Sequence, residues 1–562
     1  MTNAWRRFGL PAAVYLAIFF LLNPHLLSAF SSHYFFGGAD GYQNVWNLWW
    51  VDRAIREFGV QPWFTTLLHH PQGTTLIGHT LNPFNGLLAI ALLPLLSMVQ
   101  TYNTIVVFSF VMTGVTAFWL CAAMTRAYGP SLAGGAIFTF SSYHFMHADA
   151  HLQLTALQWL PLFVLWWIRF CEQPAPGRGV AAALMLWLVA LCDLYYFAYA
   201  VFTAALFYGW MAWRLGKWRF LLRRETWPSL LAFLIPSAAT SGVLALAIVY
   251  QQSSDPMIGT HSPRLLSMDL LSPVVPGFYW RFRDAVRPLW VPLSPYFTET
   301  SVFVGLSVIA LGIAGWRSRA GRLITHRGFW GLVVLFFGIM SLGPNLHIAG
   351  REVAFGPGIS LMGYDRINLL VLPYAVLWLL FPPWRLAGVP VRMMVMVQLA
   401  AAVLAAGGWQ ALLSSGWRWR HAAAAMTLAI VTFEYLPAPM RLTEPAVPAY
   451  VRALATLPAG AAIDLASDAP LALYYQTIHH KPIAFGYISR TPASVDRADQ
   501  ALAALILNGE WERAARDFRF TYVVKAERAA DVMVPGLPGA PLAAIEPSRR
   551  VYHDERVSIY RY

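Results

Sequence analysis

Long apolar runs, separated by short polar or basic stretches, fill most of the chain up to residue 437. Runs of roughly 17 to 25 residues have the length that a helix needs to cross a bilayer. They predict membrane spans at 8–30, 101–124, 130–146, 152–170, 179–193, 194–213, 228–251, 301–316, 329–346, 392–413 and 421–437. Two further runs, 82–99 and 368–384, leave two alternatives open: an interfacial or re-entrant segment, or a full span. We therefore expect about 11 to 13 spans.

The pattern changes after residue 437. Apolar runs there shorten to the length of strands, as in AAIDLA, FTYVVKA and RVSIYRY, and a segment with helical periodicity, SVDRADQALAALILNGEWERAARDF, lies between them. The chain is therefore predicted to be mainly α, with a polytopic transmembrane helical bundle over residues 1–437 and a small α/β domain over residues 438–562.

Composition supports a membrane protein and excludes an ordinary soluble one. Of the 562 residues 58% are hydrophobic and only 12% are charged, and the mean hydropathy is +0.51. The net charge of +13 would also suit a nucleic-acid-binding protein, but the Lys and Arg residues lie in short loops between apolar runs. That distribution is the positive-inside pattern of membrane proteins, so no nucleic-acid partner is expected.

The basic loops predict the orientation of the chain. Loops 213–225, 315–328 and 416–421 are rich in Arg and Lys and should be cytoplasmic. The N-terminus then also lies in the cytoplasm, and residues 438–562 lie on the extracytoplasmic side of the plasma (inner) membrane. The same orientation places three loops outside, at 31–81, 141–151 and 252–300.

Asp40 lies in the first of these loops, in the stretch GGADGYQNVWNLWWVDRAI at 37–55. Gln43 follows it by three residues, just before a segment with helical periodicity, which is the spacing of a capping box. An N-cap role is therefore one interpretation. The other is functional, because a carboxylate at the membrane interface is costly unless it is solvated or used.

A second polar cluster, SSYHFMHADAHLQL at 141–154, holds His144, His147, Asp149 and His151 in a turn between two predicted spans. Any one of these histidines is more often structural than a ligand. His147 and His151 are four residues apart, which on a helix places both on one side. Together with the carboxylate they favour binding of a sugar hydroxyl, a phosphate or a divalent metal such as Mg or Mn.

The order of these motifs resembles the GT-C membrane glycosyltransferases over about the first 215 residues. It comprises an aspartate after the first span, HPQGTT at 70–75, a span that ends near Arg126, PSLAGGAIFTFSSYHF, and the outer Asp149. The order is similar to that of oligosaccharyltransferase catalytic subunits and, more loosely, of protein mannosyltransferases and lipid A aminoarabinose transferases. Two departures stand out: histidines rather than a second acid flank Asp149, and the C-terminal domain shows no WWD-type motif. Transfer to Asn-X-Ser/Thr is therefore not expected.

The resemblance implies transfer of a sugar from a polyprenyl-phosphate donor to an extracytoplasmic lipid, glycan or protein. Asp40 and Asp149 are the expected catalytic carboxylates, with Asp40 as general base. The expected substrate-binding residues are His144, His147, His151, Arg264, Arg281, Arg283, Arg287 and Glu299. The arginines would stabilise the leaving phosphate, although each equally suits anchoring to anionic headgroups. A metal site, formed from Asp40, Asp149, His147 and His151, is left open.

Three further points stay open at this stage. Arg385 and Arg392 flank a Gly-Val-Pro turn, which is either an outer phosphate site or a cytoplasmic anchor. The stretch 474–490 has the mixture of aromatic and polar residues that would suit a cover over the site. The alternatives to an enzyme are a transporter or flippase of lipid-linked sugars and a non-catalytic assembly protein. The chain shows no paired halves with interrupted helices, which transporters often have.

Overall fold

The computed structural model describes residues 4–216, 223–259, 261–293, 299, 301–318, 323–353, 372–534 and 537–562. These residues form two compact units. Unit 1 comprises Met1–Phe30, Asn103–Ala245 and Thr260–Arg441, and unit 2 comprises Ser31–Tyr102, Leu246–Gly259 and Leu442–Tyr562.

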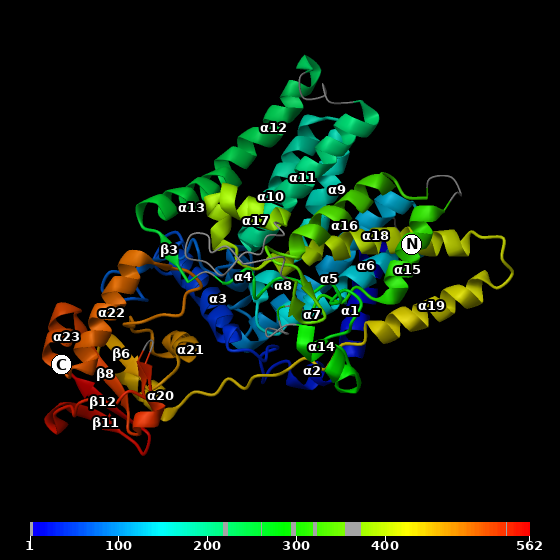
Figure 1. The fold of residues 1–562 in the computed structure, drawn as a ribbon. Coiled ribbons are helices and arrows are strands. Elements are labelled where there is room, and N and C mark those ends of the chain that lie inside the picture. Colours follow the sequence, from blue (N-terminus) through cyan, green and yellow to red (C-terminus); the bar gives the residue numbers. More distant parts are fainter. Residues whose placement is uncertain are drawn as a thin grey trace. The chain divides into compact units, whose positions relative to one another are not determined.

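Unit 1 is helical, apart from the short hairpin of β4 (His347–Ile348) and β5 (Arg351–Glu352) (Figure 1). Its helices, two of which continue into unit 2, are α1 (Leu10–Leu22), α2 (His25–Ala29), α5 (Met98–Thr125), α6 (Tyr128–Thr139), α7 (Ser142–Ala148), α8 (Leu152–Thr155), α9 (Leu160–Glu172), α10 (Pro176–Cys192), α11 (Leu194–Leu215), α12 (Trp227–Ser237), α13 (Val243–Ser254), α14 (Arg287–Trp290), α15 (Leu306–Arg317), α16 (Arg327–Ser341), α17 (Pro373–Leu380), α18 (Met394–Leu413) and α19 (Arg420–Glu434).

Five helical segments of the described chain are long and apolar enough to cross a membrane: Trp5–Leu22, Met98–Thr125, Leu194–Arg214, Arg224–Ser254 and Pro390–Leu413. Shorter apolar helices accompany them, among them α10, α15 and α16. The prediction of a mainly α, polytopic membrane protein is confirmed.

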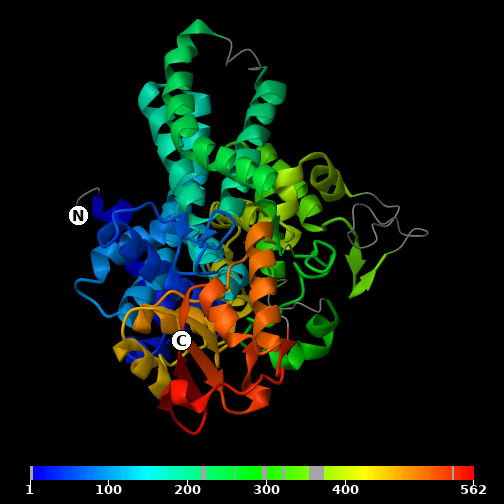
Figure 2. The ribbon, with the colours of Figure 1, turned by 90° about the vertical axis from the view of Figure 1, so that its left-hand side faces the viewer.

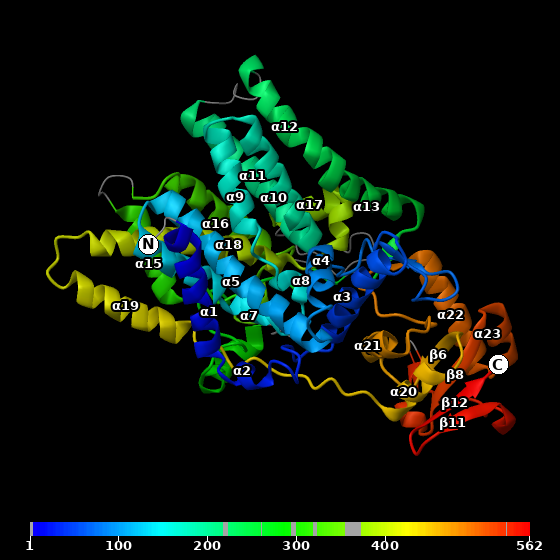
Figure 3. The same cartoon turned by 180° about the vertical axis from the view of Figure 1, so that it is seen from behind.

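Helix α18 lies at the centre of unit 1 and packs against α6, α15 and α16 (Figure 3). Most of its residues are buried. Small residues allow the close approach to α15: a Cβ atom at Gly408 would lie 1.9 Å from the carbonyl oxygen of Leu311, and one at Gly315 would lie 2.5 Å from that of Leu404. Close contact of this kind replaces the hydrophobic effect as the attraction between helices in a membrane.

Some predicted spans are divided between two helices in the structure, among them 8–30, which forms α1 and α2, as well as 130–146 and 152–170. The 130–146 run breaks after α6, where the Ser141 side chain accepts a hydrogen bond from the backbone N–H of His144 and caps α7. The 152–170 run breaks between α8 and α9. The 82–99 run forms α4 (Pro83–Leu92), whose 10 residues rise only ~15 Å and suit the interfacial or re-entrant alternative. Residues 373–380 of the 368–384 run form α17, and 368–371 lie outside the described residues.

The C-terminal part of unit 2 is the predicted α/β domain, which is confirmed (Figure 2). Its sheet has the order β11 (Arg550–His553), β12 (Val557–Arg561), β8 (Phe520–Ala526), β6 (Ala461–Leu465); β6 and β8 are parallel and the other pairs are antiparallel. Its helices are α20 (Ala449–Thr456), α21 (Ala469–His479), α22 (Ala493–Leu507) and α23 (Trp511–Asp517). The short pairs β1 (Phe64–Thr65) with β2 (Thr74–Thr75), β3 (Met257–Ile258) with β7 (Thr491–Pro492), and β9 (Met533–Val534) with β10 (Leu537–Pro538) complete the unit.

Residues 31–102 belong to this same unit, although the sequence groups them with the transmembrane domain. Helix α3 (Asp40–Arg56) packs against α4 and α21. Trp46 and Trp50 share an apolar core with Leu473. The Trp46 indole N–H donates to the Gln476 side chain at 2.7 Å, so a polar contact inside this core fixes the packing of α3 on α21.

Candidate functional site

Asp149 follows α7 and is almost fully buried in unit 1. The Arg441 guanidinium binds it with both ends of its fork: Nε donates to Oδ1 at 3.0 Å, and Nη2 donates to Oδ2. The Tyr279 hydroxyl donates to Oδ2 at 3.0 Å. A cavity of about 50 Å³ is lined by these three side chains and by Arg283. The arrangement presents guanidinium groups to a small anion, while Asp149 holds one of them in place.

A second ion pair in unit 1 joins Arg392 and Glu299. Arg392 Nη2 donates to Glu299 Oε1 at 2.6 Å and Nε donates to Oε2 at 3.2 Å, with both side chains largely buried. His151 Nε2 lies 3.6 Å from Glu299 Oε1. Burial alone would raise the pKa of Glu299, but the charge of Arg392 and its hydrogen bond outweigh burial and hold this pKa below its usual value.

His147 is fully buried beside this pair. Neither of its ring nitrogens has a hydrogen-bond partner among the residues that the structure describes. Its ring packs edge-on against Tyr143, with centroids 4.3 Å apart, and lies 5.6 Å from the ring of His151. Burial keeps the pKa of His147 well below 6.5, so the ring is neutral and presents one donor and one acceptor.

His144 has a different environment. Its Nδ1 lies 2.8 Å from the Thr139 carbonyl oxygen, its Nε2 lies 2.9 Å from that of Thr155, and its ring stacks on Phe110. Both nitrogens thus face backbone acceptors that bridge α6, α7 and α8. The structure gives His144 a packing role and leaves no ring nitrogen facing a substrate.

The four candidate arginines of the 252–300 loop differ in their surroundings. Arg264 Nε donates to Glu352 Oε2 at 2.6 Å, and Arg281 and Arg287 are exposed. Arg283 lies over the ring of Phe278 and donates to its carbonyl oxygen at 2.9 Å. Arg283 alone among the four lines the cavity beside Asp149.

Asp40 lies in unit 2 and is the first residue of α3. The N-cap interpretation is wrong, because Ala39 holds that position and makes no side-chain cap bond. Gln43 does not reach back to form a capping box: its Nε2 donates to the Tyr487 carbonyl oxygen at 3.0 Å, and its Oε1 accepts from Thr80 at 2.8 Å. The Tyr487 hydroxyl donates to Asp40 Oδ1 at 2.8 Å.

Asp40 thus belongs to unit 2, whereas Asp149, His147 and His151 belong to unit 1. That the two aspartates share one site stays a prediction. Within the described ranges, no group of three or more His, Cys, Asp or Glu side chains has an arrangement that could hold a metal ion. The metal site left open by the sequence therefore has no ligand cluster in this part of the chain.

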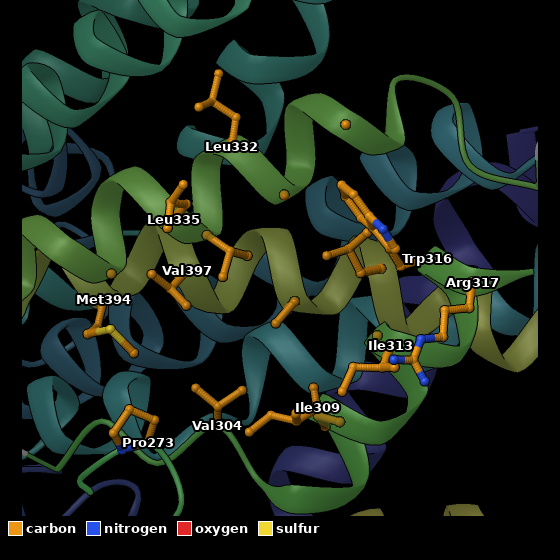
Figure 4. Close-up of a pocket in the computed structure, with 18 of the residues that line it drawn as sticks. Pro273, Val304, Ile309, Ile313, Trp316, Arg317, Leu332, Leu335, Met394 and Val397 are labelled. Atoms are coloured by element: carbon orange, nitrogen blue, oxygen red, sulfur yellow. The ribbon is translucent and has the colours of Figure 1, made fainter. Parts of the chain in front are cut away.

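A long apolar groove of about 960 Å³ runs along α15, α16 and α18 in unit 1 (Figure 4). Met394 and Pro273 lie toward one end, and Trp316 and Arg317 lie toward the other. The wall contains the helix glycines Gly312, Gly328, Gly331 and Gly338. Met394, which lines this end of the groove, follows Arg392 by two residues at the start of α18.

Two arginines of these ion pairs were not identified as site residues from sequence. The sequence leaves Arg392 between an outer phosphate site and a cytoplasmic anchor, and no motif includes Arg441. Arg441 carries a usable signal, since it is a basic residue just after the last predicted span, on the side where the positive-inside rule disfavours one.

The comparisons with known proteins agree with this architecture. A family model described as a domain of unknown function (DUF6311) matches residues 11–358. No curated protein matches the sequence. The arabinofuranosyltransferase AftD from Mycobacteria has a similar structure, with a TM-score of 0.53 and 15% identity; the match covers 100% of this chain and 42% of AftD.

Two other solved structures are more distant. The oligosaccharyltransferase of Archaeoglobus fulgidus in its apo form has a TM-score of 0.45 and 12% identity over 93% of this chain and 70% of its own. ArnT from Cupriavidus metallidurans, bound to undecaprenyl phosphate, has a TM-score of 0.48 and 10% identity over 98% of this chain and 97% of its own. The likeness to AftD identifies the fold as that of the GT-C glycosyltransferases, and the chain belongs to the DUF6311 family.

Proposed function

We propose that the protein is an integral-membrane glycosyltransferase that moves a sugar from a polyprenyl-phosphate donor to an extracytoplasmic lipid, glycan or protein. The observation that carries this proposal is the apolar groove along α15, α16 and α18, in a chain with a GT-C fold that also holds buried arginines in unit 1. A polyprenyl phosphate has the matching chemistry, since its long apolar tail suits the groove and its anionic head suits a guanidinium.

The phosphate head is the group that gains charge as the sugar leaves, and arginines are suited to stabilise it. Arg283 and Arg441 line the cavity beside Asp149. The Asp149 carboxylate accepts from Arg441 and Tyr279, so we assign it the orientation of Arg441 rather than proton abstraction. The neutral His147 would bind a hydroxyl or phosphate oxygen of the donor, and His151 with Glu299 would complete the polar wall.

The general base in this proposal is Asp40. Its carboxylate takes the proton of the acceptor hydroxyl as the acceptor oxygen bonds to the anomeric carbon. The bond between that carbon and the phosphate oxygen breaks, and the electron pair leaves with the polyprenyl phosphate. Attack opposite the leaving group inverts the anomeric configuration. A divalent ion would be more necessary for a diphosphate donor than for a monophosphate donor, because two phosphates gather more charge.

The proposed orientation places the N-terminus in the cytoplasm and residues 438–562 outside the plasma membrane, where the acceptor is met. The basic loops 213–225, 315–328 and 416–421 support it. A role in building cell-envelope glycans would follow from this position.

The test combines a strain that lacks the protein with an Asp40→Asn variant. Mass spectrometry of the strain's glycolipids and glycans should show one missing sugar and an accumulated polyprenyl-phosphate donor. Asp40→Asn should reduce transfer ~10²- to 10⁴-fold, since an amide cannot take up the proton. Asp52→Asn is the matched control on the same helix, because Asp52 forms an ion pair with the exposed Arg56 one turn further along α3.

Protein amounts in the membrane and donor binding must be measured for both variants. Transfer near the wild-type rate by Asp40→Asn would remove Asp40 from the proposal as base. A donor that accumulates on the cytoplasmic side of the membrane, with transfer intact on inverted vesicles, would favour a flippase instead.

A further inference from the structure

The short segment 486–490 of the C-terminal domain belongs to the same unit as the first turn of α3. Backbone hydrogen bonds hold the chain just before it: the Ile483 N–H donates to Leu67 O at 2.9 Å, and the His70 N–H donates to Ile483 O at 3.1 Å. Just after it, β7 pairs with β3. Gly486 lies so close to residues 68–69 that a Cβ atom there would be 3.0 Å from the His69 ring and 3.2 Å from Leu68. The segment is therefore fixed on both sides.

We propose that Tyr487 is a positioning residue for Asp40, so that the C-terminal domain forms part of the catalytic site. The Tyr487 hydroxyl donates to Asp40 Oδ1 at 2.8 Å, and the Tyr487 carbonyl oxygen accepts from Gln43 at 3.0 Å. Tyr487 thus grips the first turn of α3 at two points, one of them the proposed base. This inference rests on the proposed function, because it assigns Tyr487 a role through Asp40.

A chain of side-chain hydrogen bonds fixes the same turn from the other side. The Ser489 N–H donates to His79 Nδ1 at 3.3 Å, so the ring proton is on Nε2, which donates to Asn47 Oδ1 at 2.9 Å. Asn47 Nδ2 donates to Thr80 O at 3.2 Å, and the Thr80 hydroxyl donates to Gln43 Oε1 at 2.8 Å. The path returns through Gln43 to Tyr487, so the donors and acceptors of the whole network are determined.

Tyr487 and His79 are two titratable groups of this unit that interact with Asp40. Burial and the Asp40 charge raise the pKa of Tyr487, so its hydroxyl keeps its proton and remains a donor. Burial lowers the pKa of His79 to about 3, so the ring stays neutral above mildly acidic pH. Over the pH range of an assay, neither of these two groups therefore changes its protonation state.

A phenol that donates to one carboxylate oxygen restricts the rotation of the carboxylate and stabilises its charged form. Tyr487→Phe keeps the ring and removes only the donor. It should lower kcat roughly 10- to 100-fold, the range for loss of a hydrogen bond to a charged group. The acidic limb of the pH–rate profile should move to higher pH, because the charged carboxylate loses a stabilising donor.

Tyr552→Phe is the matched control. Tyr552 donates to Asp554 Oδ2 at 2.7 Å in the same unit, on β11 of the C-terminal sheet, which is no part of the Asp40 network. It should leave kcat and the pH profile unchanged. A variant that carries 3,5-difluorotyrosine at position 487 keeps the shape and donates more strongly, so its acidic limb should move to lower pH. Measuring melting temperatures of all variants separates loss of fold from loss of rate.

The Asp40→Asn/Tyr487→Phe double variant should be no slower than Asp40→Asn alone, because Tyr487 acts through the carboxylate. If Asp40→Asn is inactive while Tyr487→Phe keeps the wild-type kcat and pH profile, the role of Tyr487 is refuted and the proposed function survives. If the two defects multiply, or if the pH limb is the same with tyrosine, phenylalanine and difluorotyrosine, the positioning role is also refuted. If Asp40→Asn remains active, the proposed base and this inference fail together.

Discussion

The buried Arg392–Glu299 pair offers the sharpest test of how unit 1 is held together. The side chains are only 8% and 15% exposed, so removal of one partner leaves an uncompensated charge with little access to water. Breaking a buried pair in this way typically costs ~3–5 kcal/mol, whereas replacing both partners is often close to neutral. Arg392→Met should therefore destabilise the protein by ~3–5 kcal/mol, and Arg392→Met/Glu299→Gln should recover most of that loss.

The pH dependence of the free energy of unfolding provides an independent test, because the direction of the change differs between the wild type and Arg392→Met. In the wild type, the pKa of Glu299 lies below its unfolded value, so the pair contributes stability above about pH 4.5 that is lost as the pH falls. In Arg392→Met, burial without the guanidinium raises the pKa of Glu299. Acidification should then stabilise this variant as the carboxylate takes up a proton. The sign of the pH effect is thus opposite in the two proteins.

The assay is thermal or denaturant unfolding of purified protein in one detergent, for the wild type, the two single variants and the double variant, with sugar transfer measured in parallel. A double variant as unstable as Arg392→Met would refute the argument from an uncompensated charge. Measuring stability and transfer together distinguishes a structural role of the pair from a role in phosphate binding. If the pair is purely structural, the double variant should recover both stability and sugar transfer. Arg392 as a phosphate ligand predicts that stability returns while transfer does not.

Three further predictions concern other parts of the molecule. Burial lowers the pKa of His79 to about 3 in the folded protein, against about 6.5 when unfolded, so the free energy of unfolding should fall by at most ~5 kcal/mol as the pH drops from 6.5 toward 3. His79→Gln should flatten this part of a curve of stability against pH. A cysteine at the exposed Ser548 should react with an impermeant thiol reagent in intact cells, whereas one at the exposed Ser414 should react only after lysis. The three native cysteines, Cys121, Cys171 and Cys192, are buried and should not react. The reverse labelling result would invert the proposed orientation. Gly338→Leu should fill part of the apolar groove, where a Cβ atom meets nothing within 4 Å, and should weaken donor binding about tenfold, since each displaced CH₂ contact is worth ~0.8 kcal/mol. Gly209→Leu is the control, because this position is equally open but does not line the groove. Equal donor affinity in both variants would exclude the groove as the lipid site.

The apolar pattern predicted the helices of the bundle well where one run forms one helix. Segments 101–124, 179–193 and 194–213 correspond to α5, α10 and α11. A hydropathy pattern does not reveal where an apolar run is divided into two helices, because such a break needs only one capped turn. Ser141 between α6 and α7 is such a turn.

The capping box at Asp40 shows a different limit. Its spacing is correct, but a cap pattern is read over four residues, and Gln43 is instead bonded to Thr80 and to the backbone of Tyr487. Gln43 and Tyr487 are 444 positions apart, so the contact between them leaves no local pattern in the sequence. Sequence reasoning singled out Asp40 as a candidate, which stays a prediction, and it proposed the 474–490 stretch that contains Tyr487 as a cover, but it could not predict the hydrogen bond between the two residues.

The 141–154 cluster shows that residue type alone can predict a candidate site but not which of its residues could bind a ligand. Four polar residues in an apolar region suggested a site, yet the backbone decides which of them can serve it. The break before α7 points His144 at the carbonyls of Thr139 and Thr155, where a neutral ring has no nitrogen left for a ligand. One turn later, His147 is as deeply buried but lies beside an Arg–Glu pair from distant segments, with no hydrogen-bond partner in the described chain for either nitrogen. Leaving such a group unsatisfied costs ~1–3 kcal/mol, which is difficult to explain by packing and is readily explained by a ligand. The physical argument therefore separates two histidines that the sequence could not: His144 is held between backbone carbonyls, whereas ligand binding by His147 stays a prediction.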